Sequence, residues 1–176
     1  MEIKTRLLCI FRHGEYRGGN TPLTEEGRLE MKKLKGVLEG FITEFCGAGG
    51  RRRISRLYVS FSDEIRAVES VMLLRGGLHD NVWVADMYKT ERDQIAEPEK
   101  IVKEILDLAG YFKCEVVIAV AHGSMPSVIA ETARELTGGK KLARELKDIN
   151  NSHGFIVDMR YGSIFAAGPN GKTILG

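Results

Sequence analysis

The apolar segment Leu7-Leu8-Cys9-Ile10-Phe11, followed directly by Arg12-His13-Gly14-Glu15, indicates both the fold of this chain and the place of its chemistry. A short continuous apolar run is typical of a strand that is covered on both faces, as in a parallel sheet. Such sheets bind ligands at the carboxyl ends of their strands. Arg12 and His13 would stand at that position, and Gly14 permits a sharp turn there.

Arg12 and His13 together suit a phosphate group. A guanidinium offers planar, paired donors that match phosphate oxygens, and it stays charged at any working pH. An imidazole with the ordinary pKa of about 6.5 is largely neutral at pH 7, so its free ring nitrogen can attack phosphorus. The tetrapeptide alone is equally compatible with an arginine and a histidine on a solvated loop.

Strand-like runs alternate with helical patterns along the chain, which predicts an α/β fold. We expect a three-layer sandwich with a mostly parallel central sheet flanked by helices and an antiparallel edge near the C-terminus. The predicted strands are 6–11, 57–60, 82–85, 115–121, 154–158 and 163–167. Apolar residues at three- and four-residue spacing predict helices from about residues 24, 62, 98 and 124. In the second helix this spacing places Ile65, Val68 and Met72 on the buried face.

Length and composition fit a single domain over residues 1–176. Hydrophobic residues make up 43% of the chain and charged residues 28%, which is ordinary for a soluble globular protein. The net charge of +2 gives no general attraction to nucleic acid or to a membrane. The three cysteines lack a CxxC pair, so neither a disulfide framework nor a zinc site is indicated. The apolar run at the N-terminus is too short for a signal peptide, and we expect a cytoplasmic protein.

Arg66 and His122 occupy the same kind of position as Arg12-His13, each after a predicted strand and at the opening of a helix. Arg66 lies in the first helical turn, where free backbone N–H groups also face an anion. Adjacent parallel strands would bring the four residues to one edge of the sheet. Two guanidiniums and two imidazoles can neutralise a phosphoryl group and stabilise its oxygens during transfer without a metal.

At these residues the chain resembles the histidine phosphatase superfamily, also called phosphoglycerate mutase-like. The resemblance implies that His13 is a nucleophile that becomes transiently phosphorylated. It also implies that Arg12, Arg66 and His122 hold the phosphate and that no cofactor is needed. The landmarks occur in family order over nearly the whole chain: Arg12-His13-Gly14-Glu15, Pro22-Leu23-Thr24-Glu25-Glu26-Gly27, Ser60 with Arg66-Ala67, His122-Gly123 and Asn151-Ser152.

The chain departs from the family pattern at two places. Phe61-Ser62-Asp63 lacks the small residue or proline that commonly follows the serine corresponding to Ser60, and Ala121 replaces a glycine often found before the second histidine. Neither difference removes a charged group. They bear on the shape of the pocket rather than on its chemistry.

The resemblance also implies an acid that protonates the leaving oxygen. Glu91, in the Glu91-Arg92 pair after the third predicted strand, has the family position. Asp93, Asp86 and Glu15 are the alternatives, and Glu91 is also compatible with a solvated loop carboxylate. A carboxyl group that donates a proton near neutrality needs a raised pKa, through burial or a nearby phosphate.

The interval between the candidate acid and His122 is about thirty residues, and one helix and one strand nearly fill it. Little chain remains for a lid, so water can enter, which favours hydrolysis over transfer to a second position. The resemblance is closest to the short lidless branch similar to phosphohistidine phosphatases. It implies a metal-independent phosphatase acting on a phosphorylated small molecule or a phosphoprotein. Phosphoglycerate-mutase-type transfer and a non-catalytic phosphate-binding module are the alternatives.

Loop residues around the first motif extend the candidate site. Asn20 and Arg17 are positioned to contact phosphate, although the polarity of a loop explains them equally well. The cluster Arg51-Arg52-Arg53 is either a solvated loop or a contact for an anionic partner. The sequence predicts no particular substrate and no oligomeric state.

Overall fold

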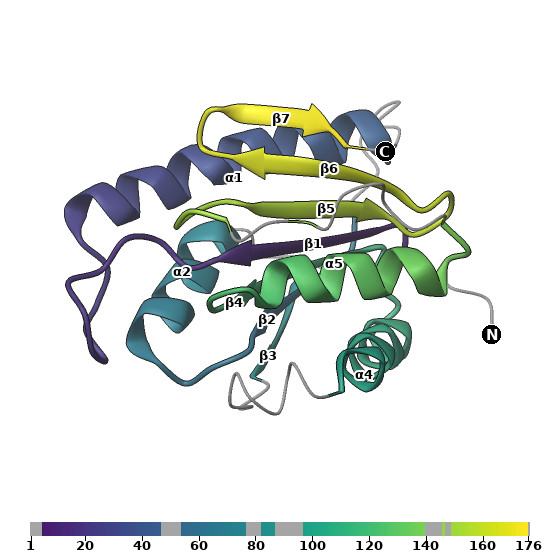
Figure 1. The fold of residues 1–176 in the computed structure, drawn as a ribbon, viewed down its shortest axis with the longest axis horizontal. Coiled ribbons are helices and arrows are strands. Elements are labelled where there is room, and N and C mark those ends of the chain that lie inside the picture. Colours follow the sequence, from purple (N-terminus) through teal and green to yellow (C-terminus); the bar gives the residue numbers. More distant parts are fainter. Residues whose placement is uncertain are drawn as a thin grey trace.

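The computed structural model describes residues 5–46, 54–76, 97–139, 146 and 149–175, together with the backbone of 82–86. No helix in these ranges is long and apolar enough to cross a membrane. In chain order the elements are β1 (Leu7–Arg12), α1 (Glu25–Phe45), β2 (Arg56–Ser60), α2 (Ile65–Arg75), β3 (Val82–Asp86), α4 (Pro98–Tyr111), β4 (Val116–Ala121), α5 (Met125–Leu136), β5 (Gly154–Asp158), β6 (Ser163–Gly168) and β7 (Gly171–Ile174) (Figure 1).

The strands form one sheet in the order β3-β2-β4-β1-β5-β6-β7. The pairings from β3 to β1 are parallel, and those from β1 to β7 are antiparallel. The predicted α/β sandwich with a parallel centre and an antiparallel C-terminal edge is therefore confirmed. The strand β7 was not predicted, because its side chains are mostly exposed and its sequence has no apolar alternation.

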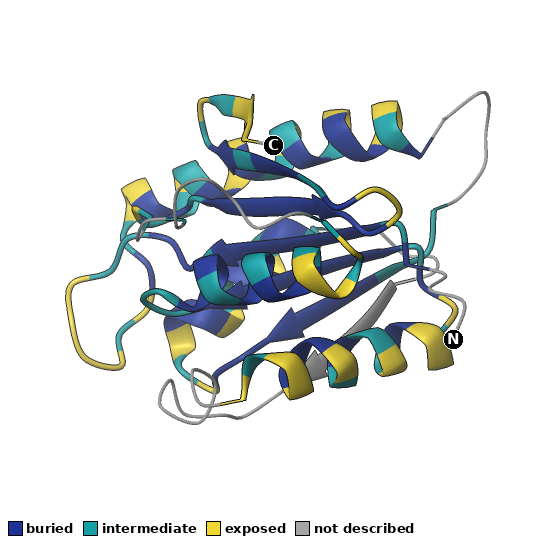
Figure 2. Cartoon of the chain, turned by 45° about the vertical axis from the view of Figure 1, so that its right-hand side comes forward, coloured by how far each residue is buried: buried dark blue, intermediate teal, exposed yellow. Residues whose placement is uncertain are grey.

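Strand β1 is covered on both faces, which explains its continuous apolar run. Leu7, Cys9 and Phe11 pack into a core with α1 and α2, whereas Leu8 and Ile10 pack into a second core with α4 and α5. All five side chains are fully buried. Figure 2 shows the buried strands between helices whose outer faces are exposed. The end of β1 is consequently held from two sides.

The face that α2 turns to the core differs from the prediction. Ile65, Val68 and Met72 are 47%, 37% and 50% exposed, and the buried positions are Arg66, Ala67, Ser70, Val71 and Leu74. The predicted face was wrong because Ala67, Val71 and Leu74 form another apolar stripe at helical spacing, and this stripe packs into the core. The Oγ of Ser70 accepts a hydrogen bond of 3.1 Å from the N–H of Gly14 and donates one of 2.7 Å to the carbonyl of Arg66.

Gly14 and Gly27 allow the loop after β1 to lie directly on the first turn of α1. A Cβ atom on Gly14 would lie 2.9 Å from the carbonyl oxygen of Gly27, and one on Gly27 would collide with the backbone of Glu15. Gly14 does not have a positive φ. The close approach, rather than a sharp turn, is thus the reason for glycine here.

Candidate functional site

Three neighbouring strands end at one edge of the sheet and carry the predicted site residues. Arg12 at the end of β1 pairs with Ala121 at the end of β4, and Ser60 at the end of β2 pairs with Val120. His13 and His122 follow these ends directly, and their ring centroids are 4.9 Å apart. The topology therefore places two imidazoles side by side.

His13 is held in one tautomer by its own loop. Its Nδ1 lies 2.8 Å from the carbonyl oxygen of Gly14. A carbonyl only accepts hydrogen bonds, so Nδ1 carries the proton and Nε2 carries the lone pair. This Nε2 accepts a hydrogen bond of 3.2 Å from Nε of Arg66. The unprotonated nitrogen of His13 thus faces a guanidinium.

The pKa values of both histidines are lowered to about 4. Burial is the largest cause in each case, because it penalises the charged imidazolium. The positive charges of Arg66 and Arg12 lower both pKa values further, and the hydrogen bond to Gly14 opposes the shift for His13. Both rings are therefore neutral at pH 7, and Nε2 of His13 keeps an unprotonated lone pair, which accepts the hydrogen bond from Arg66.

The two arginines are fixed by backbone carbonyls of two different segments. Arg66 is 9% exposed, and its Nη1 donates a hydrogen bond of 2.5 Å to the carbonyl of Gly19. Arg12 donates from Nη1 to the carbonyl of Ile149 at 2.9 Å. The buried Nε of Arg12 has no hydrogen-bond partner among the described residues. These guanidiniums retain donors for an anion.

Tyr16 is a site residue that the sequence analysis missed. Its ring lies edge-on to His13, with centroids 4.9 Å apart. The guanidinium carbon of Arg66 lies 4.2 Å from the centroid of the same ring. An aromatic residue three positions after His13 was the available signal, but its contact with Arg66 depends on the fold. Tyr16 packs against both members of the His13–Arg66 pair.

Glu64 is the second residue that the sequence analysis missed. Its carboxylate pairs with Nη2 of Arg66, and its Oε2 lies 3.8 Å from Nε2 of His122. Neither ring nitrogen of His122 has a hydrogen-bond partner among the described residues, and both are buried. His122 therefore has free hydrogen-bonding capacity beside a carboxylate.

Two of the predicted loop residues have other contacts. The side-chain oxygen of Asn20 accepts a hydrogen bond of 2.9 Å from the backbone N–H of Ile65, which ties the loop to the start of α2. Arg17 is exposed and lines a hollow of about 400 Å³ with residues 21–25 and Arg28. Asn20 thus helps to hold the loop whose Gly19 carbonyl binds Arg66.

The structure describes the four candidate acids to different extents. Glu91 and Asp93 lie outside the described residues. Asp86 ends β3, opposite Ser60 in the register, and only its backbone is described. Glu15 accepts a hydrogen bond of 2.7 Å from Oγ1 of Thr24, the N-cap of α1. Glu15 therefore supports the helix start, and the predicted acid Glu91 stays a prediction.

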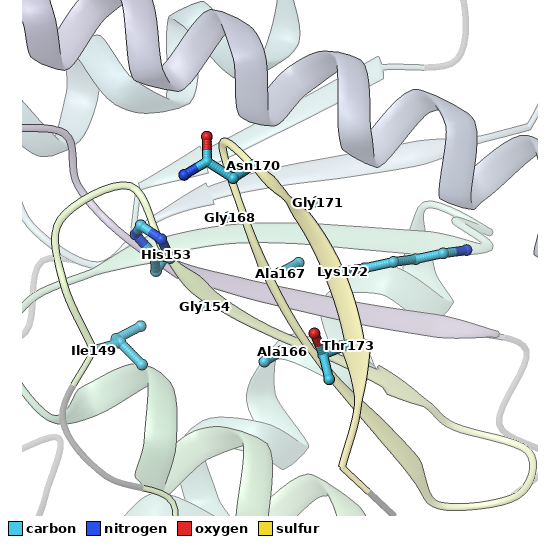
Figure 3. Close-up of a pocket in the computed structure, with 10 residues that line it drawn as sticks. All are labelled: Ile149, His153, Gly154, Ala166, Ala167, Gly168, Asn170, Gly171, Lys172 and Thr173. Carbon is cyan, nitrogen blue, oxygen red and sulfur yellow. The ribbon is translucent and has the colours of Figure 1, made fainter.

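A second hollow, of about 270 Å³, lies beside the β6–β7 hairpin (Figure 3). Small side chains and glycines make up most of its lining. His153 borders it and has its Nδ1 2.8 Å from the carbonyl of Asn151. Lys172 extends away from His153, and its Nζ pairs with Glu44 at 2.5 Å. In the described part of the chain, no three histidine, cysteine or carboxylate residues group as metal ligands do.

Fold and cluster together define a three-layer α/β protein with histidines and arginines at the carboxyl edge of its parallel strands. No protein-family model matches the sequence, and no curated protein matches it. Solved structures do match it over almost its whole length, and they show that the chain shares their fold. The fold that the resemblance implies is confirmed.

Three of these structures show the extent of the similarity. The first is the Rv3214 protein of Mycobacterium tuberculosis, with 15% identity, a TM-score of 0.51 and coverage of 96% of this chain and 95% of that chain. A protein assigned as the phosphohistidine phosphatase SixA of Nakamurella multipartitia has 12% identity, a TM-score of 0.52 and coverage of 96% and 92%. Phosphoglycerate mutase from Bacillus anthracis has 12% identity, a TM-score of 0.52 and coverage of 99% and 94%. Identities this low establish the fold alone.

Proposed function

We propose that this protein is a metal-independent phosphatase that hydrolyses a phosphomonoester or a phosphoprotein through a phosphohistidine at His13. The observation that carries the proposal is the orientation of the His13 ring. Its Nδ1 is 2.8 Å from the carbonyl of Gly14, and its unprotonated Nε2 faces Arg66. A neutral, buried imidazole with a fixed lone pair beside a cation is suited to attack a phosphoryl group.

The groups around His13 support its role by their charge. Arg12 and Arg66 supply two positive charges, and His122 supplies ring nitrogens that no described residue binds. Charged donors fixed in advance around a phosphoryl group stabilise the charge on its oxygens during transfer. We assign phosphate binding to Arg12, Arg66 and His122.

The reaction has two steps. Nε2 of His13 gives up its hydrogen bond from Nε of Arg66 and attacks phosphorus. The bond from phosphorus to the leaving oxygen breaks, and that oxygen takes a proton from Glu91, the proposed acid. A water molecule then attacks the phosphohistidine and returns a proton to the Glu91 carboxylate. The phosphorus–nitrogen bond breaks, and inorganic phosphate leaves while His13 regains its lone pair.

The short interval before His122 favours hydrolysis over mutase-type transfer. Helix α4 and strand β4 account for 20 of the roughly thirty residues between Glu91 and His122, 14 in the helix and 6 in the strand. A site with little chain to cover it admits water. It also admits a phosphorylated side chain of another protein, which agrees with the phosphohistidine phosphatase among the structures that share the fold.

Phosphate release by the purified protein, measured with and without EDTA, tests the proposal. We expect equal hydrolysis in both and, after rapid quenching with labelled substrate, an acid-labile and base-stable phosphate on the protein. His13→Ala should lose both turnover and label, whereas His153→Ala should keep them. Hydrolysis that needs an added metal, or normal turnover by His13→Ala, would refute the proposal. Phosphate binding without turnover would favour a binding module.

A further inference from the structure

Glu64 places a carboxylate among groups that are otherwise suited to hold an anion. Its side chain is 36% exposed, yet the Oε2 atom is buried. This oxygen pairs with Nη2 of Arg66 and lies 3.8 Å from Nε2 of His122. Glu64 therefore contacts one of the proposed phosphate-binding groups and lies close to another.

A phosphate bound at this place would compete with the carboxylate. A negative oxygen of phosphate prefers the same guanidinium face and imidazole nitrogen that Glu64 now approaches. Two anions that share one small site repel each other, so one of them has to leave or take up a proton. Glu64 and a phosphate dianion cannot both keep full contact with Arg66.

The backbone of Glu64 is anchored by hydrogen bonds, whereas its carboxylate is held by the ion pair with Arg66. The N–H of Glu64 donates to Oγ of Ser62 at 3.0 Å, and its carbonyl accepts from the N–H groups of Ala67 and Val68. Although Glu64 is the N-cap residue of α2, its side chain makes no capping hydrogen bond. Rotation about the side-chain bonds can carry the carboxylate to solvent without any change in the helix.

We propose that the Glu64 carboxylate is an internal competitor for phosphate, which occupies part of the phosphate site when it is empty and is displaced when phosphate binds. The proposal rests on the proposed function, because it takes Arg66 and His122 as the phosphate-binding groups. Since the site binds phosphate only while Glu64 is displaced, the apparent affinity is lower than the intrinsic one. The same competition favours release of the product phosphate.

Binding of inorganic phosphate to the full chain, measured by calorimetry at pH 7.5 and fixed ionic strength, tests this. Glu64→Gln keeps the shape of the side chain but removes its charge, and we expect it to bind phosphate on the order of tenfold more tightly than the wild type. Asp63→Asn is the matched control, because it removes the same charge from the exposed neighbouring residue. Its effect should be much smaller. Glu64→Asp, with a shorter reach, should give an intermediate affinity.

Other results would refute the competition by Glu64, and they differ from the result that would refute the proposed function. If Glu64→Gln binds phosphate no better than Asp63→Asn, or more weakly than the wild type, Glu64 supports Arg66 instead. That result would refute the proposal that Glu64 competes with phosphate. If Glu64→Gln leaves the affinity for phosphate unchanged but lowers kcat for substrates with poor leaving groups, Glu64 is a proton donor. That result would also refute the proposal that Glu64 competes with phosphate. If no variant binds phosphate, the proposed phosphate site fails as well.

Discussion

The Nε–H group of Arg66 donates a hydrogen bond of 3.2 Å to Nε2 of His13, so a guanidinium faces the only ring nitrogen that has a lone pair. Burial is the main reason that the pKa of His13 is lowered to about 4, and the positive charge of Arg66 lowers this pKa further. When a phosphoryl group enters, the same guanidinium lies beside the phosphorus that the nitrogen attacks. The contact thus adds to the effect of burial on the nucleophile and places a cation beside the phosphoryl group.

The first prediction concerns the geometry of this contact. Arg66→Lys keeps the charge but loses the planar set of donors that reaches both His13 and Gly19. We expect kcat/KM to fall on the order of 10²-fold in steady-state assays. Arg160→Lys is the control, because Arg160 also makes two side-chain hydrogen bonds, but both go to the carboxylate of Asp158, near the start of β1. Equal activity of the two variants would exclude a special role for Arg66.

The sequence contained enough information to predict the parallel half of the fold. A run that is apolar at every position, as in Leu7–Phe11, requires cover on both faces. Polar residues directly after such runs then gather at one edge, whichever helices cover the sheet. For this reason His13 and His122 could be placed without knowledge of side-chain contacts.

The parts that the sequence did not predict depend on features that apolar spacing does not reveal. Apolar spacing is compatible with two faces of α2, and the face that packs into the core is the one with Ala67, Val71 and Leu74, where Ser70 binds the backbone of Gly14. Tyr16 and Glu64 belong to the site because they contact Arg66, and no sequence pattern predicts these contacts. The exposed strand β7 lacks the apolar alternation by which strands are recognised.

The second prediction concerns pH and stability. The native pKa of about 4 for His13 and His122 lies below the ordinary value of 6.5. Between these values the unfolded chain binds protons that the native protein does not, so stability falls as the pH is lowered through this range. We expect a loss on the order of 2 kcal/mol for each histidine between pH 7 and pH 5.

Urea unfolding at these two pH values measures the effect. A variant with both His13→Asn and His122→Asn has no ring to protonate at either position, so its stability should change less between pH 7 and pH 5. A loss as large as that of the wild type would show that other groups govern the acid response.

The third prediction separates the ring of Tyr16 from its hydroxyl group. The ring packs against His13 and under the guanidinium of Arg66. Tyr16→Phe keeps these contacts and should retain kcat/KM within about threefold, because a phenyl face also attracts a cation. Tyr16→Leu should lower kcat/KM on the order of tenfold through misplacement of both groups. The ring has no positioning role if the two variants behave alike in parallel assays.

The fourth prediction tests the acid. Glu91→Gln cannot donate a proton to the leaving oxygen, so alkyl phosphates, whose leaving groups are poor, should slow on the order of 10²- to 10³-fold. Aryl phosphates with good leaving groups need little protonation and should slow much less. Asp93→Asn is the matched comparison in the same segment. Equal losses on both substrate classes would contradict the role of Glu91.

The last prediction concerns the support of the site by α1. A Cβ atom on Gly27 would collide with the backbone of Glu15, two residues after His13. Neither backbone can yield without moving the loop, so Gly27→Ala should cost about 1 to 3 kcal/mol of unfolding free energy and lower kcat/KM as well. Gly36, in the same helix, has open space where its Cβ would be. Gly36→Ala should therefore stabilise the protein by up to about 1 kcal/mol in the same urea titration. If Gly27→Ala matches Gly36→Ala in stability and activity, the loop does not depend on this contact.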